Sequence, residues 1–177
     1  MPLVPVKDVP SGANSGWELH LDLGSIKGES ASSAHPEQVE LRGFSWSGTN
    51  TPIRTAGGTG ASKAGRPSLS EMTVVKGVDK ATTGLWYALY SGQAIKTATI
   101  SLSKSTGGKK PEDYFTMTLS NVFVSSIHLH SGEGESGMGT ESVTLSYDSI
   151  DLVYKRQGAD GLLTNAGVVS FSLAAGK

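Results

Sequence analysis

The chain has 177 residues, with 15 lysines and arginines, 16 aspartates and glutamates, and no cysteine. A net charge of −1 argues against binding nucleic acid through its phosphates, and the absence of cysteine excludes disulfides and thiolate metal sites. No apolar run approaches the roughly 20 residues that span a bilayer. The start of the chain lacks the basic and apolar regions of a secretory signal peptide. We therefore expect one soluble domain, made in the cytoplasm, without membrane insertion.

Alternating apolar and polar residues predict a chain made mainly of half-buried strands. Residues 17–23 alternate cleanly, and residues 38–47 change phase at Gly43, where a bulge would re-aim the side chains. Residues 69–76 and 95–104 read as the next two strands. These patterns predict that the chain forms a β-sheet protein.

The second half of the chain contains two longer strand patterns that change phase in the middle. Residues 114–130 indicate a long strand or a bent pair, with the change after Asn121, and residues 140–154 repeat the behaviour. Such changes are typical of a strand that serves two packing surfaces in a closed or corner-bent sheet. The apolar residues after Gly167 predict one last short strand.

Only residues 80–90 have the spacing of a helix. Asp79 is the expected N-cap and Gly92 follows the last turn, whereas Gly84 inside the segment counts against a helix. A lone helix is expected to pack on the outside of the sheet. The fold class predicted is therefore mainly β, a two-sheet β-barrel or tightly curved sandwich with one flanking α-helix.

A metal site is the first chemical hypothesis. His128 and His130 lie on one face of a strand with Glu133 and Glu135 nearby, which resembles part of a cupin metal motif. The motif is incomplete, because no histidine follows His130 and the framing glycines are missing. The alternative is two solvent-facing histidines near a strand end, and no metal or cofactor is assigned.

Enzyme motifs are otherwise lacking. The chain contains no Gly-x-Ser-x-Gly elbow, and the glycines at positions 57, 58 and 60 are not followed by the lysine, hydroxyl residue and helix of a phosphate-binding loop. His20 and His35 are expected to be structural. The lack of a convincing site favours a structural or assembly protein over an enzyme.

Several predicted strands have one face rich in serine and threonine but poor in charge. Phe44 and Trp46 project to one side of their strand, and Ser45 and Ser47 to the other. The aromatic face belongs in the core, whereas the hydroxyl face suits a smooth, weakly interacting polar wall.

The order of several short motifs resembles one known family. These motifs are Ile26-Lys27-Gly28-Glu29-Ser30 with His35, Phe44-Ser45-Trp46, Leu69-Ser70-Glu71-Met72-Thr73-Val74-Val75-Lys76, Val78-Asp79-Lys80-Ala81, Gly92-Gln93-Ala94-Ile95, Asn121-Val122-Phe123-Val124-Ser125-Ser126-Ile127 and Thr140-Glu141-Ser142-Val143-Thr144-Leu145-Ser146-Tyr147. Together they resemble Hcp, the haemolysin-coregulated tube protein of type VI secretion. The resemblance covers residues 17–157, which we take as the domain. It leaves an N-terminal extension (1–16) and a C-terminal tail (158–177) outside.

The resemblance implies a non-enzymatic subunit that forms six-membered rings. In the family these rings stack into a tube with a spike protein at its tip, a contractile sheath around it and effector proteins in its lumen. The tube is assembled in the cytoplasm and then secreted. The first aromatic of the motif, Phe44, departs from the tryptophan often found there.

Two sets of site residues follow from the resemblance. Ser45 looks like a serine that faces the lumen and affects effector retention. The glycine-rich loop, residues 49–67, looks like a loop that reaches the neighbouring ring. Its candidate ring-stacking residues are Thr49, Arg54, Gly57, Gly58, Gly60 and Lys63.

Two other interpretations stay open at this point. One is a tail-tube protein of a phage or another contractile injector. The other is a cupin-like metal-binding protein that uses His128 and His130.

Overall fold

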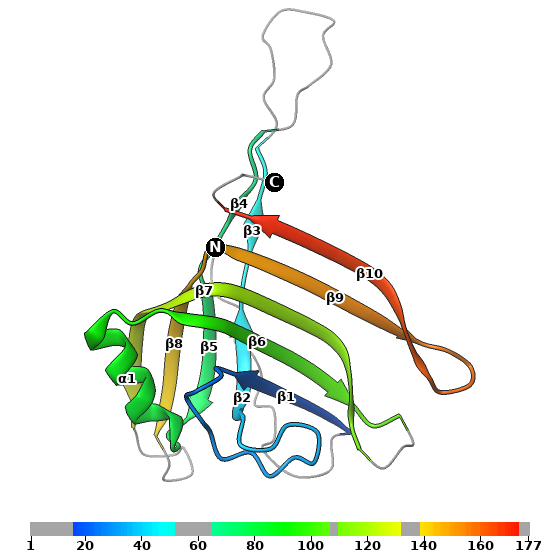
Figure 1. The fold of residues 1–177 in the computed structure, drawn as a ribbon, viewed down its shortest axis with the longest axis horizontal. Coiled ribbons are helices and arrows are strands. Elements are labelled where there is room, and N and C mark those ends of the chain that lie inside the picture. The colour runs from blue at the N-terminus through cyan, green and yellow to red at the C-terminus, as the bar shows by residue number, and fades with distance from the viewer. Residues whose placement is uncertain (1–15, 52–64, 107–109, 132–138, 174–177) are drawn as a thin grey trace, which may run out of the picture.

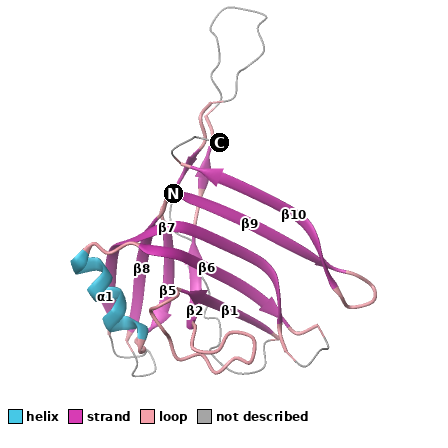
Figure 2. Ribbon diagram, in the orientation of Figure 1, coloured by secondary structure: helices cyan, strands magenta, loops and turns pink. Residues whose placement is uncertain are grey.

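A computed structural model describes residues 16–51, 65–106, 110–131 and 139–173. The described part forms ten strands and one helix (Figures 1 and 2). They are β1 (Trp17–Asp22), β2 (Val39–Ser45), β3 (Gly48–Thr49), β4 (Ser68–Leu69), β5 (Met72–Gly77), α1 (Ala81–Ser91), β6 (Ile95–Lys104), β7 (Glu112–His130), β8 (Thr140–Ser146), β9 (Ser149–Gln157) and β10 (Leu163–Ser172).

Six of these strands close into a barrel. The order along the main sheet is β10-β9-β7-β6-β1-β2-β5-β8, and β8 also pairs with β7, which closes the ring of β7, β6, β1, β2, β5 and β8. Every neighbouring pair is antiparallel. The predicted fold class, a β-barrel with one flanking helix, is confirmed.

The long strand β7 bends where its phase change predicted. Its first half pairs with β6 and β9, and its second half pairs with β8. Asn121 lies at the bend with a left-handed φ of 52°, which asparagine tolerates better than most residues. Leu119 before it and Val122 after it are both fully buried. The phase change therefore keeps apolar side chains inside on both sides of the corner.

The strand predicted over residues 140–154 is wrong as a single element. It is divided into β8 and β9 by Tyr147 and Asp148, which lie opposite the bend of β7. The backbone N–H of Asp148 donates to the carbonyl of Ser120 at 3.0 Å, and its carboxylate accepts the side-chain amide of Asn121. The chain from β8 to β9 therefore changes direction at the same place as β7.

The bulge expected at Gly43 is present, because the register between β2 and β5 shifts between Leu41 and Gly43. The segment predicted as residues 38–47 ends earlier, at Ser45, and the chain then enters the short hairpin of β3 and β4. Likewise, the strand predicted over residues 69–76 is split between β4 and β5. The hairpin projects from the barrel in Figure 1.

The helix lies against β7, with Leu85 among its buried residues. Asp79 caps it, since its carboxylate accepts the backbone N–H of Ala81 at 2.9 Å, and Gly92 ends it with a φ of 63°. A Cβ on Gly84 would lie 3.0 Å from Cγ2 of Ile26. The glycine that argued against a helix therefore allows a close approach between the helix and the turn after β1.

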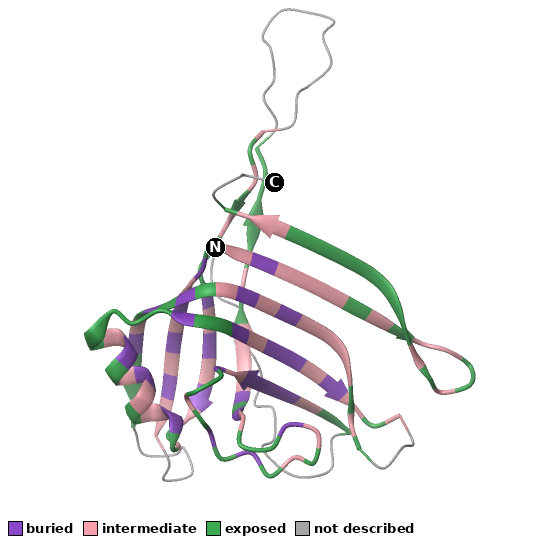
Figure 3. Cartoon of the chain, in the orientation of Figure 1, coloured by how far each residue is buried: buried purple, intermediate pink, exposed green. Residues whose placement is uncertain are grey.

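The last two strands extend beyond the barrel (Figure 1). β9 pairs with β7, and β10 pairs with β9 and forms the outer edge of the sheet. Most of β10 is exposed, with 62% of Val168 and 61% of Val169 accessible to solvent (Figure 3). β10 has ten residues and is longer than the short strand expected. We call β9 and β10 the arm.

Candidate functional site

Ser45, the predicted lumen residue, lies at the exposed end of β2 between two aromatic side chains that pack against the core. It pairs with Thr73 of β5, Thr73 pairs with Thr144 of β8, and Thr144 pairs with Ser126 of β7. The hydroxyls of Thr73 and Thr144 are 3.3 Å apart. Cross-strand partners share one face of a sheet, so these four hydroxyl residues form one line, here called the hydroxyl row.

Two further rows on one side of the hydroxyl row also lack carboxylates. The two rows beside the hydroxyl row consist of Gly43, Val75, Ser142 and His128, and of Gly77, Thr140 and His130. Arg42 reaches across this face and donates to the hydroxyl of Thr140 at 2.6 Å. The three rows contain no carboxylate. They match the smooth polar wall expected from the strand patterns.

The ring-stacking candidates are only partly visible. Thr49 lies in β3, exposed and paired with Ser68 of β4. The other candidates lie outside the described residues, namely Arg54, Gly57, Gly58, Gly60 and Lys63.

The base of the β3–β4 hairpin is held by side chains from the barrel. The indole N–H of Trp46 donates to the hydroxyl of Tyr147 at 2.7 Å, and that hydroxyl donates to the carbonyl of Ser70 at 2.8 Å. Tyr147 is 7% exposed. Burial raises the pKa of its hydroxyl above the ordinary value of 10.0, although the hydrogen bond from Trp46 opposes this rise. The hydroxyl therefore remains protonated and able to donate.

Two histidines form a buried cluster on the outer side of β1. The rings of His20 and His35 stack with centroids 4.7 Å apart. His35 Nε2 lies 2.8 Å from Asp113 Oδ1 and 2.9 Å from the hydroxyl of Ser103. A Ser-His-Asp triad uses the two ring nitrogens for its two partners, whereas here both partners meet one nitrogen and Ser103 is fully buried. The cluster is therefore structural, as expected for these histidines.

His20 is held in an environment that disfavours its charged form. Its Nε2 is 3.0 Å from the hydroxyl of Ser30, while its buried Nδ1 makes no hydrogen bond and lies 3.8 Å from Glu18. The pKa of His20 is below its ordinary value of 6.5, first because of burial and then because of His35, although Glu18 and Asp113 act in the opposite direction.

A second buried cluster joins β5, β8 and the start of α1. Lys76 Nζ lies 2.7 Å from Glu141 Oε2 and 2.7 Å from Asp79 Oδ1. Thr82 donates its hydroxyl to the same Glu141 oxygen at 2.7 Å. Both Lys76 and Glu141 are completely buried. Glu141 Oε2 makes both contacts of that carboxylate, whereas the buried Oε1 has no hydrogen-bond partner among the described residues. The cluster anchors the helix to the barrel.

Sequence reasoning missed this cluster, although a signal for it existed. Lys76 continues the phase of Met72 and Val74, and Glu141 continues the phase of Val143. A lysine and a glutamate that each fall in the apolar phase of a strand indicate a buried ion pair, since lone charges are rarely buried.

The predicted metal ligands His128 and His130 are exposed at the end of β7. Glu133 and Glu135 lie outside the described residues. Within the described ranges, no group of three or more His, Asp or Glu side chains could hold a metal ion.

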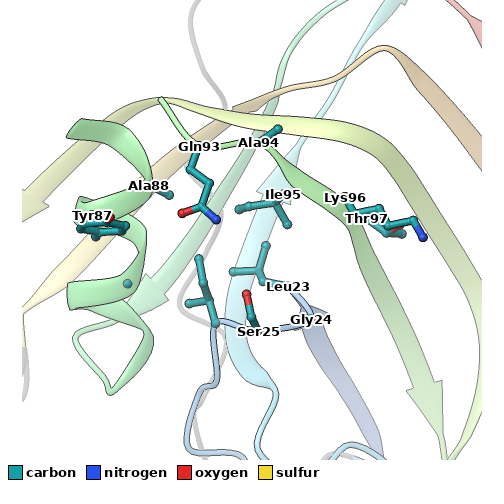
Figure 4. Close-up of a pocket in the computed structure, with 12 residues that line it drawn as sticks. Leu23, Gly24, Ser25, Tyr87, Ala88, Gln93, Ala94, Ile95, Lys96 and Thr97 are labelled. Atoms are coloured by element: carbon teal, nitrogen blue, oxygen red, sulfur yellow. The ribbon is translucent and has the colours of Figure 1, made fainter. Parts of the chain in front are cut away.

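A groove of about 550 Å³ lies between α1, the turn after β1 and the start of β6 (Figure 4). Tyr87 and Gln93 line it together with Ile26 and Ile95. Among the described residues that line it, only Lys96 carries a charged side chain. No helix in the described part of the chain has the length and apolar character needed to cross a membrane.

Comparison with known proteins agrees with this structural character. The family described as "Type VI secretion system effector, Hcp" matches residues 20–154. Protein hcp1 of Pseudomonas aeruginosa is 31% identical over 144 residues, which are 81% of this chain and 86% of that protein.

Solved structures have the same fold. A type six secretion system protein superposes with a TM-score of 0.81 and 25% identity, over 91% of this chain and 98% of that chain. Hcp1 from Salmonella typhimurium superposes with a TM-score of 0.70 at 20% identity, over 90% of this chain and 97% of that chain, and shows likeness of fold alone.

A six-stranded barrel with one flanking helix and a hydroxyl-rich outer face defines a structural β-barrel subunit. The chain belongs to the Hcp family, the tube proteins of type VI secretion. This assignment favours the type VI secretion tube over both alternative interpretations, the phage-type injector and the cupin-like metal protein.

Proposed function

We propose that the chain forms hexameric rings that stack into the inner tube and carry effector proteins in the lumen. The observation that carries ring formation is the arm. Among the described strands, β10 pairs only with β9 and exposes valines on both faces. An edge strand of this length and apolar character favours pairing with another chain. A second copy of the same subunit satisfies that edge in a ring.

The cargo side of the ring is assigned to the hydroxyl row and its neighbouring rows. The three rows are rich in hydroxyls and contain no carboxylate, so they offer hydrogen bonds to varied proteins with little electrostatic repulsion. Ser45, at one end of the row, is the proposed lumen contact. The domain is residues 17–157, and the extension 1–16 has no assigned function. The tail 158–177 contributes β10 of the arm.

Stacking is assigned to the β3–β4 hairpin and the loop that it carries, with Thr49 at its described base. Loops of this kind make head-to-tail contacts, which generate open filaments when repeated. The remaining partners are a spike protein at the tip, a contractile sheath and the effectors. The tube is assembled in the cytoplasm and leaves the cell by type VI secretion.

The lumen assignment is tested by replacing Ser45→Glu, with Ser33→Glu as a matched control on the exposed turn after β1. Both variants add one charge at an exposed serine, so both should form rings by light scattering. Co-purification of an effector should fall at least tenfold for Ser45→Glu alone. Unchanged retention would remove Ser45 from the lumen.

The stacking assignment is tested by trimming residues 56–64. Rings should form normally, while tubes seen by negative-stain microscopy become short or disappear. Tubes of normal length from the trimmed protein would exclude the loop from stacking.

A further inference from the structure

The backbone segments just before β3 and just after β4 lie side by side at Ser47 and Ser70, where the β3–β4 hairpin leaves the barrel. We call this place the crossing. The N–H of Ser70 donates to the carbonyl of Ser47 at 2.9 Å, and the N–H of Ser47 donates to the hydroxyl of Ser70 at 3.0 Å. Beyond this crossing, two cross-strand pairs lie within the described residues, Gly48 with Leu69 and Thr49 with Ser68. A single two-stranded hairpin is at best marginally stable in water, so the direction of this one depends on what holds the crossing to the barrel.

The crossing is held to the barrel through Tyr147. This residue lies between β8 and β9, at the corner where both strands turn, and its ring is buried. Its hydroxyl accepts from Trp46 on one side and donates to the Ser70 carbonyl on the other. Trp46 itself follows β2 and packs against the core. One hydroxyl thus connects both segments of the crossing to the corner of the barrel.

We propose that Tyr147 is the positioning residue of the β3–β4 hairpin. Its hydroxyl fixes the angle at which the hairpin projects and so presents the hairpin to the next ring. The aromatic ring contributes to the core, whereas the hydroxyl contributes to hairpin position. These two contributions are separable, because Tyr147→Phe removes the hydroxyl and keeps the ring.

The direct test is hydrogen exchange on intact rings. In Tyr147→Phe, the amides of Ser47 and Ser70 should exchange about tenfold faster, since two hydrogen bonds at the crossing are lost. Amides of the barrel strands should keep their protection and the rings their size. Tyr154→Phe is the matched control, because Tyr154 is 47% exposed on β9. Exchange at Ser47 and Ser70 that equals the wild type would overturn the proposal.

A second variant tests the other hydrogen bond of the Tyr147 hydroxyl, the one that it accepts from Trp46. Trp46→Phe removes the indole donor but leaves the bond from Tyr147 to Ser70 in place. It should accelerate exchange at the crossing less than Tyr147→Phe does. An equal or larger acceleration would assign the hairpin to Trp46 packing instead of the Tyr147 hydroxyl.

The functional readout is tube length, and only this part rests on the proposed function. Tyr147→Phe should shorten tubes severalfold while the midpoint of thermal unfolding changes little, whereas a merely structural residue would lower that midpoint without a specific effect on stacking. If the chain trimmed at residues 56–64 stacks normally, the stacking role of the hairpin fails. The exchange experiment still decides the role of Tyr147 in that case. If trimming abolishes tubes but Tyr147→Phe leaves tube length unchanged, the positioning role fails.

Discussion

The closed barrel and the open arm differ in how far they bury their apolar residues. In the barrel, the apolar faces of β1, β5, β6 and β8 meet one another, and even the charges of Lys76 and Glu141 are paired inside. In the arm, β10 has a partner on one side and exposes apolar residues on both faces. The barrel is closed within one chain, whereas the arm ends in an edge strand that, in the proposed function, pairs with a second copy of the chain. Changes in the barrel should therefore affect unfolding, and changes in the arm should affect association.

The largest effect is expected from breaking the buried ion pair. Lys76→Ala leaves the buried carboxylate of Glu141 without its cation, which should lower the free energy of unfolding by about 3–5 kcal/mol. The double variant Lys76→Met with Glu141→Leu removes both charges and should regain most of that loss. Thermal and urea unfolding measure both variants. A double variant as unstable as the single one would show that the cluster acts through helix anchoring and not through the unpaired charge.

The next effect concerns the arm. Val169 pairs with Leu152 and lies on the face that continues from buried Ile150, whereas Val168 pairs with Val153 on the opposite face. Successive residues of a strand point to opposite sides. Val169→Glu should therefore weaken ring formation more than Val168→Glu does, by about tenfold to a hundredfold in the dissociation constant, as expected for one buried valine.

Light scattering across a dilution series measures this difference. Unfolding stability of both variants should stay within about 0.5 kcal/mol of the wild type, because both positions are exposed in the single chain. Equal ring stability in Val169→Glu and wild type would exclude this face of the arm from the ring interface.

The barrel was largely predictable from the sequence because alternation reports which side of a strand is buried. The phase changes at Gly43 and Asn121 indicated a bulge and a corner, and both exist. Alternation gives no information on where a strand ends if the chain continues in nearly the same direction. For that reason the alternation includes Tyr147 and Asp148 in one strand, although they separate β8 from β9.

The candidate site was less predictable. The position of Ser45 on the hydroxyl face of its strand followed from alternation, but the alignment of Thr73, Thr144 and Ser126 beside it depends on the register between four strands. The contact of Tyr147 with Trp46 joins residues 101 positions apart. Local patterns hold no information on such pairs.

The smallest effect expected is a pH dependence of the unfolding stability that arises from His20 in the barrel. The native pKa of His20 is lowered by burial and by stacked His35, so the native state binds fewer protons than the unfolded chain below pH 6.5. The stability that neutral His20 contributes is present above pH 6.5 and is lost as the pH falls toward the native pKa. Glu18 and Asp113 oppose this loss and keep it small.

Thermal unfolding of the wild type should therefore move to lower temperature between pH 7.5 and 5.5. His20→Gln cannot gain the proton and should show a smaller shift, whereas His128→Gln, at an exposed histidine of β7, should shift like the wild type. The same pH dependence in all three proteins would mean that the segment covering β1 is held by its backbone bonds, such as Ser30 N–H to the Gln38 carbonyl at 3.0 Å. In that case, protonation of the His20–His35 stack would not change the unfolding stability of the barrel.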